Sequence, residues 1–166
     1  MKGNIVVGQS GGPTAVINSS VAGVYAAAKK IGVNKVYGMV HGIEGFLDDK
    51  MIELEDYLAE PTGIELLKRT PSAFLGSCRF KMPKIEGHED VYEKVFEIME
   101  KHDIECLFYA GGHDSMDTVK MLSDYAAAHN KPQRFMGVPK TIDNDLPITD
   151  HCPGYGSAAK YIATSI

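Results

Sequence analysis

Two carboxylates, Asp143 and Asp145, stand two positions apart in the segment PKTIDNDLP at residues 139–147. If the segment is extended, side chains two positions apart point to the same side. One carboxylate could then take a proton from a hydroxyl group while the other holds a divalent cation, a pairing that suits phosphoryl transfer. An Asp-rich turn, which Asn144 would favour, is the alternative interpretation.

Two glycine-containing segments could hold an anion. GQSGGPTAVIN (residues 8–18) and AGGHDSMDT (residues 110–118) each follow an apolar run and lead into a helical pattern. Backbone N–H groups at a helix N-terminus favour negative charge. Neither segment has the GxGxxG or GxxxxGK(S/T) spacing of the common nucleotide-binding loops, and close packing of strand and helix is the alternative. Asp114 or Ser115 is expected to cap the second helix.

The elements that must position these segments alternate along the chain. Apolar, β-branched and aromatic runs predict strands at residues 4–9, 35–40, 105–111 and 134–139. Helical periodicity predicts helices at residues 15–30, 89–103 and 115–130, with Gly32 as the stop after the first. Strands alternating with helices indicate an α/β fold with a mainly parallel sheet and helices on both faces.

Two stretches are less regular. Within residues 41–87, FLDDKMIELEDYL predicts a hairpin followed by a short helix. The pattern GYGSAAKYIATSI (residues 154–166) predicts a helix that reaches the end of the sequence without a Gly, Asn or Pro stop. We therefore expect the rest of a larger protein to be missing from this chain.

The glycine segments and the acidic segment share one position relative to the strands. Residues 8–18, 110–118 and 139–147 each begin where a predicted strand ends. The carboxyl ends of parallel strands border the ligand crevice of such sheets. We expect the three segments to line one crevice, which favours chemistry over a simple turn for Asp143 and Asp145.

Composition excludes several classes of protein. The 166 residues are 44% hydrophobic and 23% charged, as expected for one globular domain, and the net charge of -5 argues against nucleic acid as a partner. No apolar run is long enough to span a membrane, and the first residues predict a strand, not a secretory signal. Three cysteines without CxxC spacing indicate reduced thiols in the cytoplasm.

Five segments together resemble the phosphofructokinase family. They are GQSGGPTAVIN, FLGSCRF (residues 74–80), GGHDS, GVPKTIDNDL (residues 137–146) and TDHCPGYGSAAKY (residues 149–161), in the family's order and spacing. The resemblance covers almost the whole chain and implies a phosphoryl-donor-binding N-terminal domain at residues 1–166, with the C-terminal part absent. The PKTIDND form resembles the pyrophosphate-using branch. The resemblance implies transfer of a phosphoryl group from pyrophosphate, with Mg²⁺, to the 1-hydroxyl of fructose 6-phosphate, giving fructose 1,6-bisphosphate in glycolysis.

The resemblance also implies roles for single residues. The donor would contact Gly12, Arg79, Phe80, Gly112, His113, Asp114 and Ser115. The sugar phosphate would be lined by Thr141, Ile142 and Asp143, with Asp143 as the base that takes the hydroxyl proton. Asp145 would help to hold Mg²⁺. Arg79 as a plain surface arginine is the alternative that the residue alone would favour.

Three positions bear on the donor and the metal. ATP-using members usually carry glycine where this chain has Asp114 and Lys140. The resemblance implies that Asp114 repels a nucleotide and that Lys140 acts in catalysis by stabilising charge on the leaving group; a solvated lysine is the alternative. His113 departs from the family, which usually has aspartate there, and imidazole is a poor ligand for Mg²⁺. A loop histidine hydrogen-bonded to neighbouring backbone is the alternative for His113.

Two rival functions stay open at this point. One is the ATP-dependent 6-phosphofructokinase reaction, and the other is a non-catalytic, phosphofructokinase-like domain that binds phosphate or assembles with a full subunit. In the family, most contacts to the sugar phosphate come from beyond residue 166, some from a second subunit. We therefore expect a homo-oligomer for the full-length protein and no kinase activity for these 166 residues alone.

Overall fold

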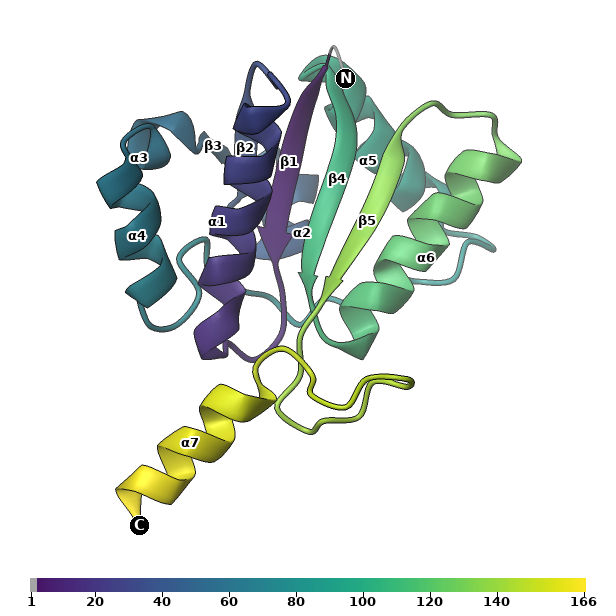
Figure 1. Ribbon diagram of the computed structural model, residues 1–166. Coiled ribbons are helices and arrows are strands. Elements are labelled where there is room, and N and C mark those ends of the chain that lie inside the picture. Colours follow the sequence, from purple (N-terminus) through teal and green to yellow (C-terminus); the bar gives the residue numbers. More distant parts are fainter. Residues whose placement is uncertain (1–2) are drawn as a thin grey trace.

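A five-stranded sheet forms the centre of the molecule in the computed structural model, which describes residues 3–166 (Figure 1). Its strands lie in the order β3-β2-β1-β4-β5. The strands are β1 (Asn4–Gln9), β2 (Val36–Met39), β3 (Met51–Glu53), β4 (Ile104–Gly111) and β5 (Arg134–Pro139). β2, β1, β4 and β5 are parallel, and β3 is antiparallel to β2. The expected mainly parallel sheet is confirmed.

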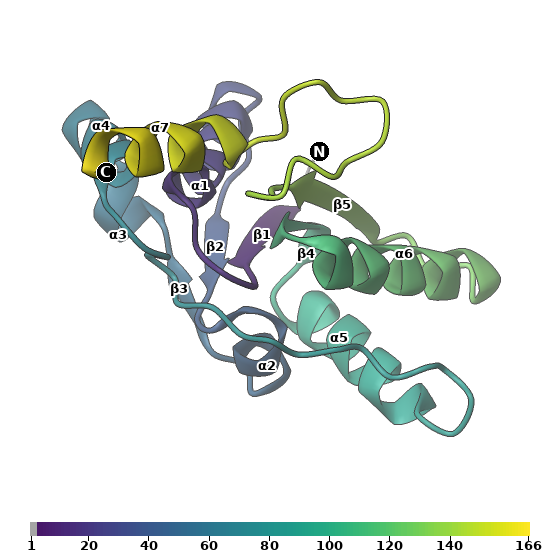
Figure 2. The same ribbon diagram turned by 90° about the horizontal axis from the view of Figure 1, so that it is seen from below.

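Within the described residues the chain forms seven helices. They are α1 (Ala15–Lys30), α2 (Gly42–Leu47), α3 (Glu55–Leu58), α4 (Pro61–Arg69), α5 (Glu89–Lys101), α6 (His113–Ala128) and α7 (Tyr155–Ser165). Figure 2 shows α1, α3 and α4 on one side of the sheet and α2, α5 and α6 on the other. This arrangement confirms the expectation that helices cover both faces.

Alternation along the strands divides the core into two layers. Val6 packs with Leu107 of β4 and with side chains of α2, α5 and α6. Its neighbours Ile5 and Val7 point to the opposite face, where they pack against α1, α3 and α4. Because β1 is buried on both faces, its sequence is a continuous apolar run without the polar alternation of a half-exposed strand.

The end of α1 follows the expected pattern. Gly32 adopts φ +80°, a conformation that favours glycine. Its N–H donates to the Lys29 carbonyl oxygen, and the Val33 N–H donates to that of Ala28. These two bonds satisfy carbonyl groups that the last turn of a helix otherwise leaves unpaired.

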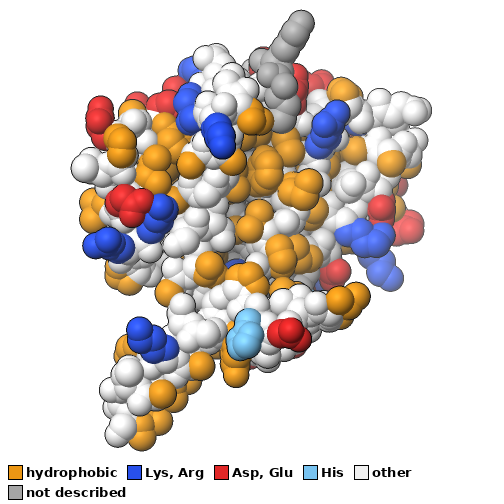
Figure 3. Space-filling view, viewed as in Figure 1, with side chains coloured by type: hydrophobic (Ala, Val, Ile, Leu, Met, Phe, Trp, Pro, Cys, Tyr) orange, Lys and Arg blue, Asp and Glu red, His pale blue; other side chains and the backbone are white. Residues whose placement is uncertain are grey.

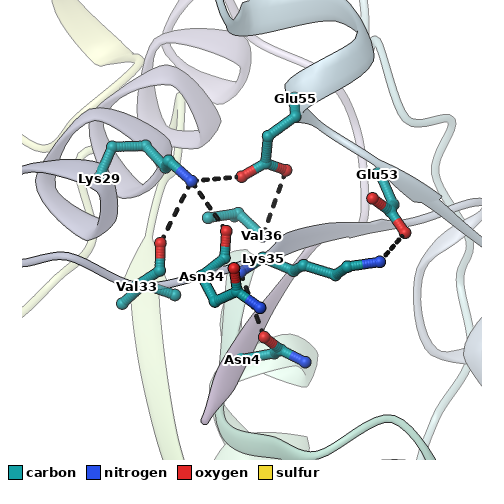
Figure 4. A network of polar contacts seen from close by, with 8 residues as sticks. All are labelled: Asn4, Lys29, Val33, Asn34, Lys35, Val36, Glu53 and Glu55. Atoms are coloured by element: carbon teal, nitrogen blue, oxygen red, sulfur yellow. Dashed lines mark hydrogen bonds and ion pairs between the residues drawn. The ribbon is translucent and has the colours of Figure 1, made fainter. Parts of the chain in front are cut away.

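A polar network then joins the end of α1 to the edge of the sheet (Figure 4). Lys29 Nζ donates to the carbonyl oxygens of Val33 and Asn34 and lies 2.7 Å from Glu55 Oε1. Glu55 in turn accepts a hydrogen bond from the Val36 N–H at the start of β2. The network lies at the amino ends of the strands, so it positions α1 and β2 from the side opposite to the predicted crevice.

One part of the sheet has no helix over it. Figure 3 shows hydrophobic side chains gathered over β4 and β5 in the view of Figure 1. Met136 of β5 is 54% exposed on this face. Helix α7 extends away from the body (Figure 1) and buries none of its side chains. The covered part of the molecule is therefore the part that carries β1, β2 and the turns that follow β1 and β4.

Two predicted elements differ from the structure. Phe46 and Leu47 belong to α2 instead of a hairpin strand, and β3 finds its antiparallel partner in β2 on the far side of that helix. The short helix expected next is α3. Helix α6 begins at residue 113, two residues before the expected start. The pairing of β3 with β2 across α2 is a contact that a local pattern does not show.

Two further expectations concern cysteines and membranes. Cys78, Cys106 and Cys152 are all buried and free, in agreement with the expected reduced thiols. Within residues 3–166, none of the helices combines the length and the apolar character needed to cross a bilayer.

Candidate functional site

The turns after β1, β4 and β5 meet at one crevice of about 430 Å³. It lies at the carboxyl ends of the strands, where the chain turns to one side after β1 and to the other after β4. The residues that line it are 10–14, 78–80, 112–115 and 140–143. The expectation that the glycine segments and the acidic segment share one crevice is confirmed, and the loop at residues 78–80 joins them.

The turn after β1 exposes its backbone to the crevice. Gly11 has φ +74°, and its N–H donates to the Cys78 carbonyl oxygen at 3.0 Å. Its own carbonyl oxygen accepts from Ser77 Oγ at 2.5 Å. A Cβ atom on Gly12 would meet open space, so the main chain there is open to a ligand. The turn is thus fixed from behind and uncovered in front, as an anion-binding backbone needs to be.

Lys140 is a buried cation beneath this turn. Its side chain is part of a residue only 7% exposed, and Nζ donates to the Gly12 carbonyl oxygen at 2.5 Å. Burial, and then the charge of Arg79, lower the pKa of Lys140 from its ordinary 10.5, while Asp143 acts in the opposite direction. The alternative of a solvated lysine is therefore wrong. Lys140 places positive charge where it is poorly screened by water.

The N-terminus of α6 forms a second wall of the crevice. Gly112 is the N-cap residue and makes no side-chain cap, so the predicted cap by Asp114 or Ser115 is wrong. Ser115 is buried, and a Cβ atom on Gly111 would come within 2.5 Å of its Cβ. Ser115 thus lies in the first turn of α6, beside the end of β4. Asp114 lies in the same turn and lines the crevice.

The acidic segment forms a turn, and the expectation that it is extended is wrong. Asn144, between the two aspartates, has φ +55°. Its side-chain oxygen accepts from the Cys152 N–H at 3.0 Å, and its Nδ2 donates to the Asp150 carbonyl oxygen. The turn interpretation is thus correct for the backbone. Asp143 nevertheless lines the crevice, so the turn and a chemical role are compatible.

Thr141 forms hydrogen bonds with both aspartates of this turn. Its Oγ1 donates to Asp145 Oδ1 at 2.9 Å and accepts from the Asp143 N–H at 3.0 Å. Asp145 does not line the crevice itself. Its Oδ2 lies 3.6 Å from His113 Nδ1, across from the start of α6. The two carboxylates therefore occupy different places, Asp143 inside the crevice and Asp145 beside His113.

A buried pair of amides carries the loop that bears Arg79. Gln9 Nε2 donates to Asn18 Oδ1 at 2.8 Å, and both residues are fully buried. Gln9 Oε1 accepts from the Leu75 N–H, and Asn18 accepts from the Phe74 N–H. The main chain just before Arg79 is thereby tied to β1 and α1. The side chain of Arg79 is exposed at the crevice, while Phe80 packs against the core.

The crevice gathers all but one of the predicted site residues. Those that line it are Gly12, Arg79, Phe80, Gly112, His113, Asp114, Ser115, Lys140, Thr141, Ile142 and Asp143. Asp145 stays outside the lining. Sequence reasoning missed Ser10, Pro13, Thr14 and Cys78. The first three stand in the glycine segment, whose position after a strand was the available signal; Cys78 is brought in by a long-range contact.

The crevice is not a ready-made metal site. Among residues 3–166, no three His, Cys, Asp or Glu side chains come together in a way that could hold a metal ion. His113 and Asp145 are two potential ligands on facing elements. Any cation there would need further ligands from a bound molecule or from water. The arrangement of Lys140, Arg79 and the open Gly12 backbone instead suits an anionic ligand such as a phosphate group.

Comparison with known proteins gives a consistent result. The sequence profile of the family described as "Phosphofructokinase" matches residues 4–166. A pyrophosphate–fructose 6-phosphate 1-phosphotransferase of Xanthomonas campestris pv. campestris is 45% identical over 166 residues. The match covers 99% of this chain and 38% of that protein. The chain thus spans well under half the length of this relative.

A solved structure and a more distant relative complete the comparison. The crystal structure of a pyrophosphate-dependent phosphofructokinase from Marinobacter aquaeolei matches with a TM-score of 0.86 and 45% identity, over 99% of this chain and 40% of that one. An ATP-dependent 6-phosphofructokinase of Actinobacillus succinogenes is 33% identical over 162 residues, which are 98% of this chain and 46% of that protein. The similarity to the pyrophosphate-dependent protein is the greater of the two.

Proposed function

Because the chain belongs to the phosphofructokinase family, we propose that it is the phosphoryl-donor half of a pyrophosphate-dependent phosphofructokinase. The reaction transfers one phosphoryl group of pyrophosphate to the 1-hydroxyl of fructose 6-phosphate and releases phosphate. One observation carries the proposal: Lys140, Arg79 and Asp143 border a single crevice floored by the open backbone of Gly12. Two cations and one carboxylate are the charges that a diphosphate donor and an alcohol acceptor require.

Asp143 is assigned the role of general base. It accepts the proton of the 1-hydroxyl as the oxygen of that hydroxyl forms a bond to phosphorus and the bridging P–O bond breaks. Support comes from its place in the lining and from the Thr141 hydroxyl that accepts a hydrogen bond from its N–H. Thr141 and Ile142 border the same end of the crevice and are assigned to the sugar phosphate.

Lys140 is assigned to the phosphate that leaves. Its Nζ is held against the Gly12 carbonyl oxygen, so the charge is in place before the donor binds. A preorganised cation in a water-poor site stabilises negative charge that develops on the leaving group. Arg79 is exposed at the mouth, where its planar guanidinium can contact two donor oxygens. Gly12, Phe80, Gly112, His113 and Ser115 are assigned to the walls around the donor.

Asp114 is assigned to donor selection. It lines the crevice and also a neighbouring hollow of about 240 Å³ that Lys81 and Lys84 border. If a donor longer than a diphosphate extends from the crevice into this hollow, it passes the carboxylate of Asp114. Repulsion between this carboxylate and a further phosphate disfavours ATP. The observation supports pyrophosphate as donor.

Mg²⁺ is the cofactor that the family implies, and the residues present fit it only in part. Bound to a diphosphate, the ion neutralises charge on the donor oxygens. Asp145 offers carboxylate oxygen, which Mg²⁺ prefers, but the group facing Asp145 is the imidazole of His113. We assign Asp145 to the cation.

A matched pair of assays on the full-length protein tests the proposal. Fructose 1,6-bisphosphate formation is measured by an aldolase-coupled reaction with pyrophosphate and, separately, with ATP as donor. We expect turnover with pyrophosphate and little with ATP. Faster turnover with ATP would identify an ATP-dependent 6-phosphofructokinase. No turnover with either donor would favour a non-catalytic phosphate-binding or assembly domain. The observation that favours this role is the imidazole of His113, which stands where Mg²⁺ would prefer an oxygen ligand. Light scattering on the same sample tests the expected homo-oligomer.

A further inference from the structure

His113 and Asp145 face each other with space between them. Nδ1 of His113 lies 3.6 Å from Oδ2 of Asp145. A hydrogen bond between nitrogen and oxygen spans about 2.7–3.2 Å, so the two groups are not directly hydrogen-bonded. Asp145 Oδ1 accepts from Thr141 Oγ1 at 2.9 Å, which fixes the carboxylate with Oδ2 toward the histidine. One nitrogen and one oxygen are therefore held close together on two different elements.

The separation of these two atoms suits a shared metal ion. Ions such as Zn²⁺ bind imidazole nitrogen and carboxylate oxygen at about 2.0–2.2 Å. An ion at about 2.1 Å from both atoms would fit a gap of this width with an angle at the metal of about 120°. One ion could therefore contact both atoms.

The chemistry of the two ligands favours a transition ion over Mg²⁺. Imidazole suits transition ions, whereas Mg²⁺ is a hard ion that prefers oxygen. For a site with nitrogen and oxygen ligands, affinity rises from Mn²⁺ through Co²⁺ to Cu²⁺.

Two protein ligands do not hold an ion by themselves. No third His, Cys, Asp or Glu completes a metal site within the described part of the chain. The remaining ligands must come from water and from a diphosphate in the adjoining crevice, whose lining includes His113. The ion and the diphosphate should therefore bind together, each raising the affinity of the other.

We propose that His113 Nδ1 and Asp145 Oδ2 form half of a cation site that selects a first-row transition ion, such as Co²⁺ or Mn²⁺, over Mg²⁺ when a diphosphate is bound. The inference rests on the proposed function for the diphosphate and goes beyond it in assigning the metal. It makes His113 a determinant of cation choice.

Spectroscopy on the full-length protein tests the inference without turnover. The sample contains Mn²⁺ and methylenediphosphonate, a diphosphate that cannot transfer its phosphoryl group. We expect electron spin-echo modulation from a directly bound nitrogen of His113. Calorimetry with Co²⁺ and Mg²⁺ in the same solution gives the ratio of the two affinities. His113→Asp should lower the preference for Co²⁺ over Mg²⁺ by about tenfold or more. Even the loss of a residue that only hydrogen-bonds to a metal ligand lowers metal affinity by about 10–100-fold.

A matched control separates the site from a general charge effect. His88 is an exposed histidine at the N-terminus of α5, and His88→Asp makes the same substitution there. It should leave the nitrogen modulation and the Co²⁺ preference unchanged. Nitrogen modulation that persists in His113→Asp, or its absence from the unmodified protein, would overturn the inference. Phosphoryl transfer from pyrophosphate with Mg²⁺ in a protein without nitrogen modulation would leave the proposed function intact, so the two failures are distinguishable.

Discussion

At the scale of single residues, the crevice combines charges of opposite sign at short range. Buried Lys140 and exposed Arg79 face the acids Asp114 and Asp143 around the same space. Burying the ammonium group of Lys140 costs free energy unless a partner compensates its charge. The hydrogen bond to the Gly12 carbonyl oxygen supplies only part of that compensation. A bound diphosphate would supply the rest, since its negative charge would meet the ammonium group directly. The charges that are costly in the unliganded protein are those that the proposed donor uses.

Asp143→Asn is expected to reduce turnover in the full-length protein by about 10²–10⁴-fold, the range that a positioned general base contributes. Asparagine keeps the size of the side chain and cannot accept the hydroxyl proton. The Michaelis constant for fructose 6-phosphate should change little. Steady-state kinetics with pyrophosphate check both values. Turnover within a few-fold of the unmodified protein would show that another group is the base.

Asp114→Gly is expected to admit ATP, because it removes the carboxylate between the crevice and the hollow beside Lys81 and Lys84. Lys140→Gly added to it should strengthen the effect, and the two changes need not be additive because both residues face the same phosphates. Calorimetry with ATP measures the gain. Asp117→Gly is the control, since Asp117 borders the hollow without lining the crevice. No ATP binding in either Asp114 variant would contradict the assignment.

The pH dependence of the reaction should report Lys140. Its pKa is lowered from 10.5, chiefly by burial, so the ammonium group loses its proton at a lower pH than an exposed lysine. The charged form is the active one, and kcat/KM is therefore expected to fall on the alkaline side below pH 10.5. Lys140→Arg, which stays charged, should remove this fall while lowering the maximum. The same alkaline limb in the arginine variant would assign it to another group.

At the scale of elements, regular segments were predictable and the turns between them only in part. The strands at residues 4–9 and 134–139 and the helix at residues 15–30 have the predicted bounds, because their periodicity is local information. The early start of α6 at residue 113 has no signal in the periodicity. The turn at Asn144 depends on a loop that returns at Cys152, a contact that a local pattern does not show.

The same distinction holds within the site. The crevice was predictable because its three segments follow strands. The bond from Lys140 to Gly12 joins residues 128 positions apart, and the approach of His113 to Asp145 joins the start of α6 to the acidic turn. Neither contact leaves a signal in one sequence. Their consequences, a buried cation and a nitrogen beside a carboxylate, are the features on which the chemistry depends.

The amide pair of Gln9 and Asn18 should decide how firmly the Arg79 loop is held. Asn18→Ala leaves one buried and two part-buried polar groups without their partner, and an unpaired buried group costs about 1–3 kcal/mol. Local opening of the loop should become easier by about 2 kcal/mol, which is about 30-fold in the hydrogen exchange of the Leu75 amide. Affinity for pyrophosphate should fall with it.

Ser19→Ala provides the comparison for this variant. Ser19 is the next residue of α1 and makes only a 3.4 Å contact with the Lys68 carbonyl oxygen. Exchange of the Leu75 amide and pyrophosphate affinity should both stay unchanged in this variant. Equal effects of the two substitutions would mean that the loop depends on α1 as a whole and not on the buried amides.

At the scale of the whole molecule, the crevice of the proposed donor lies among the described residues, and two of their surfaces stay open. The uncovered face of β4 and β5, with Met136 exposed, and the projecting α7, with Tyr161 73% exposed, are surfaces that a larger assembly could cover. The start of α7 lies beside the crevice, because Pro13, Thr14 and Ile142 line both the crevice and a hollow that residues of α7 border. With the proposed function, donor binding is expected to need less of the chain than acceptor binding, because only residues 141–143 are assigned to the acceptor.

Residues 1–166 alone are expected to bind pyrophosphate weakly and to lack kinase activity. Catalysis by positioning requires both substrates within bonding distance, and a misplacement of about 1 Å can cost on the order of 10²-fold. The crevice supplies Lys140, Arg79 and the Gly12 backbone for the donor, but for the acceptor only the short wall formed by residues 141–143. Calorimetry with pyrophosphate and an aldolase-coupled assay on the purified 166-residue polypeptide check the two halves of the prediction, with the Lys140→Met variant as the control for donor binding. Turnover comparable to that of the full-length protein would refute it, because residues 1–166, alone or as an oligomer, would then hold the acceptor as well.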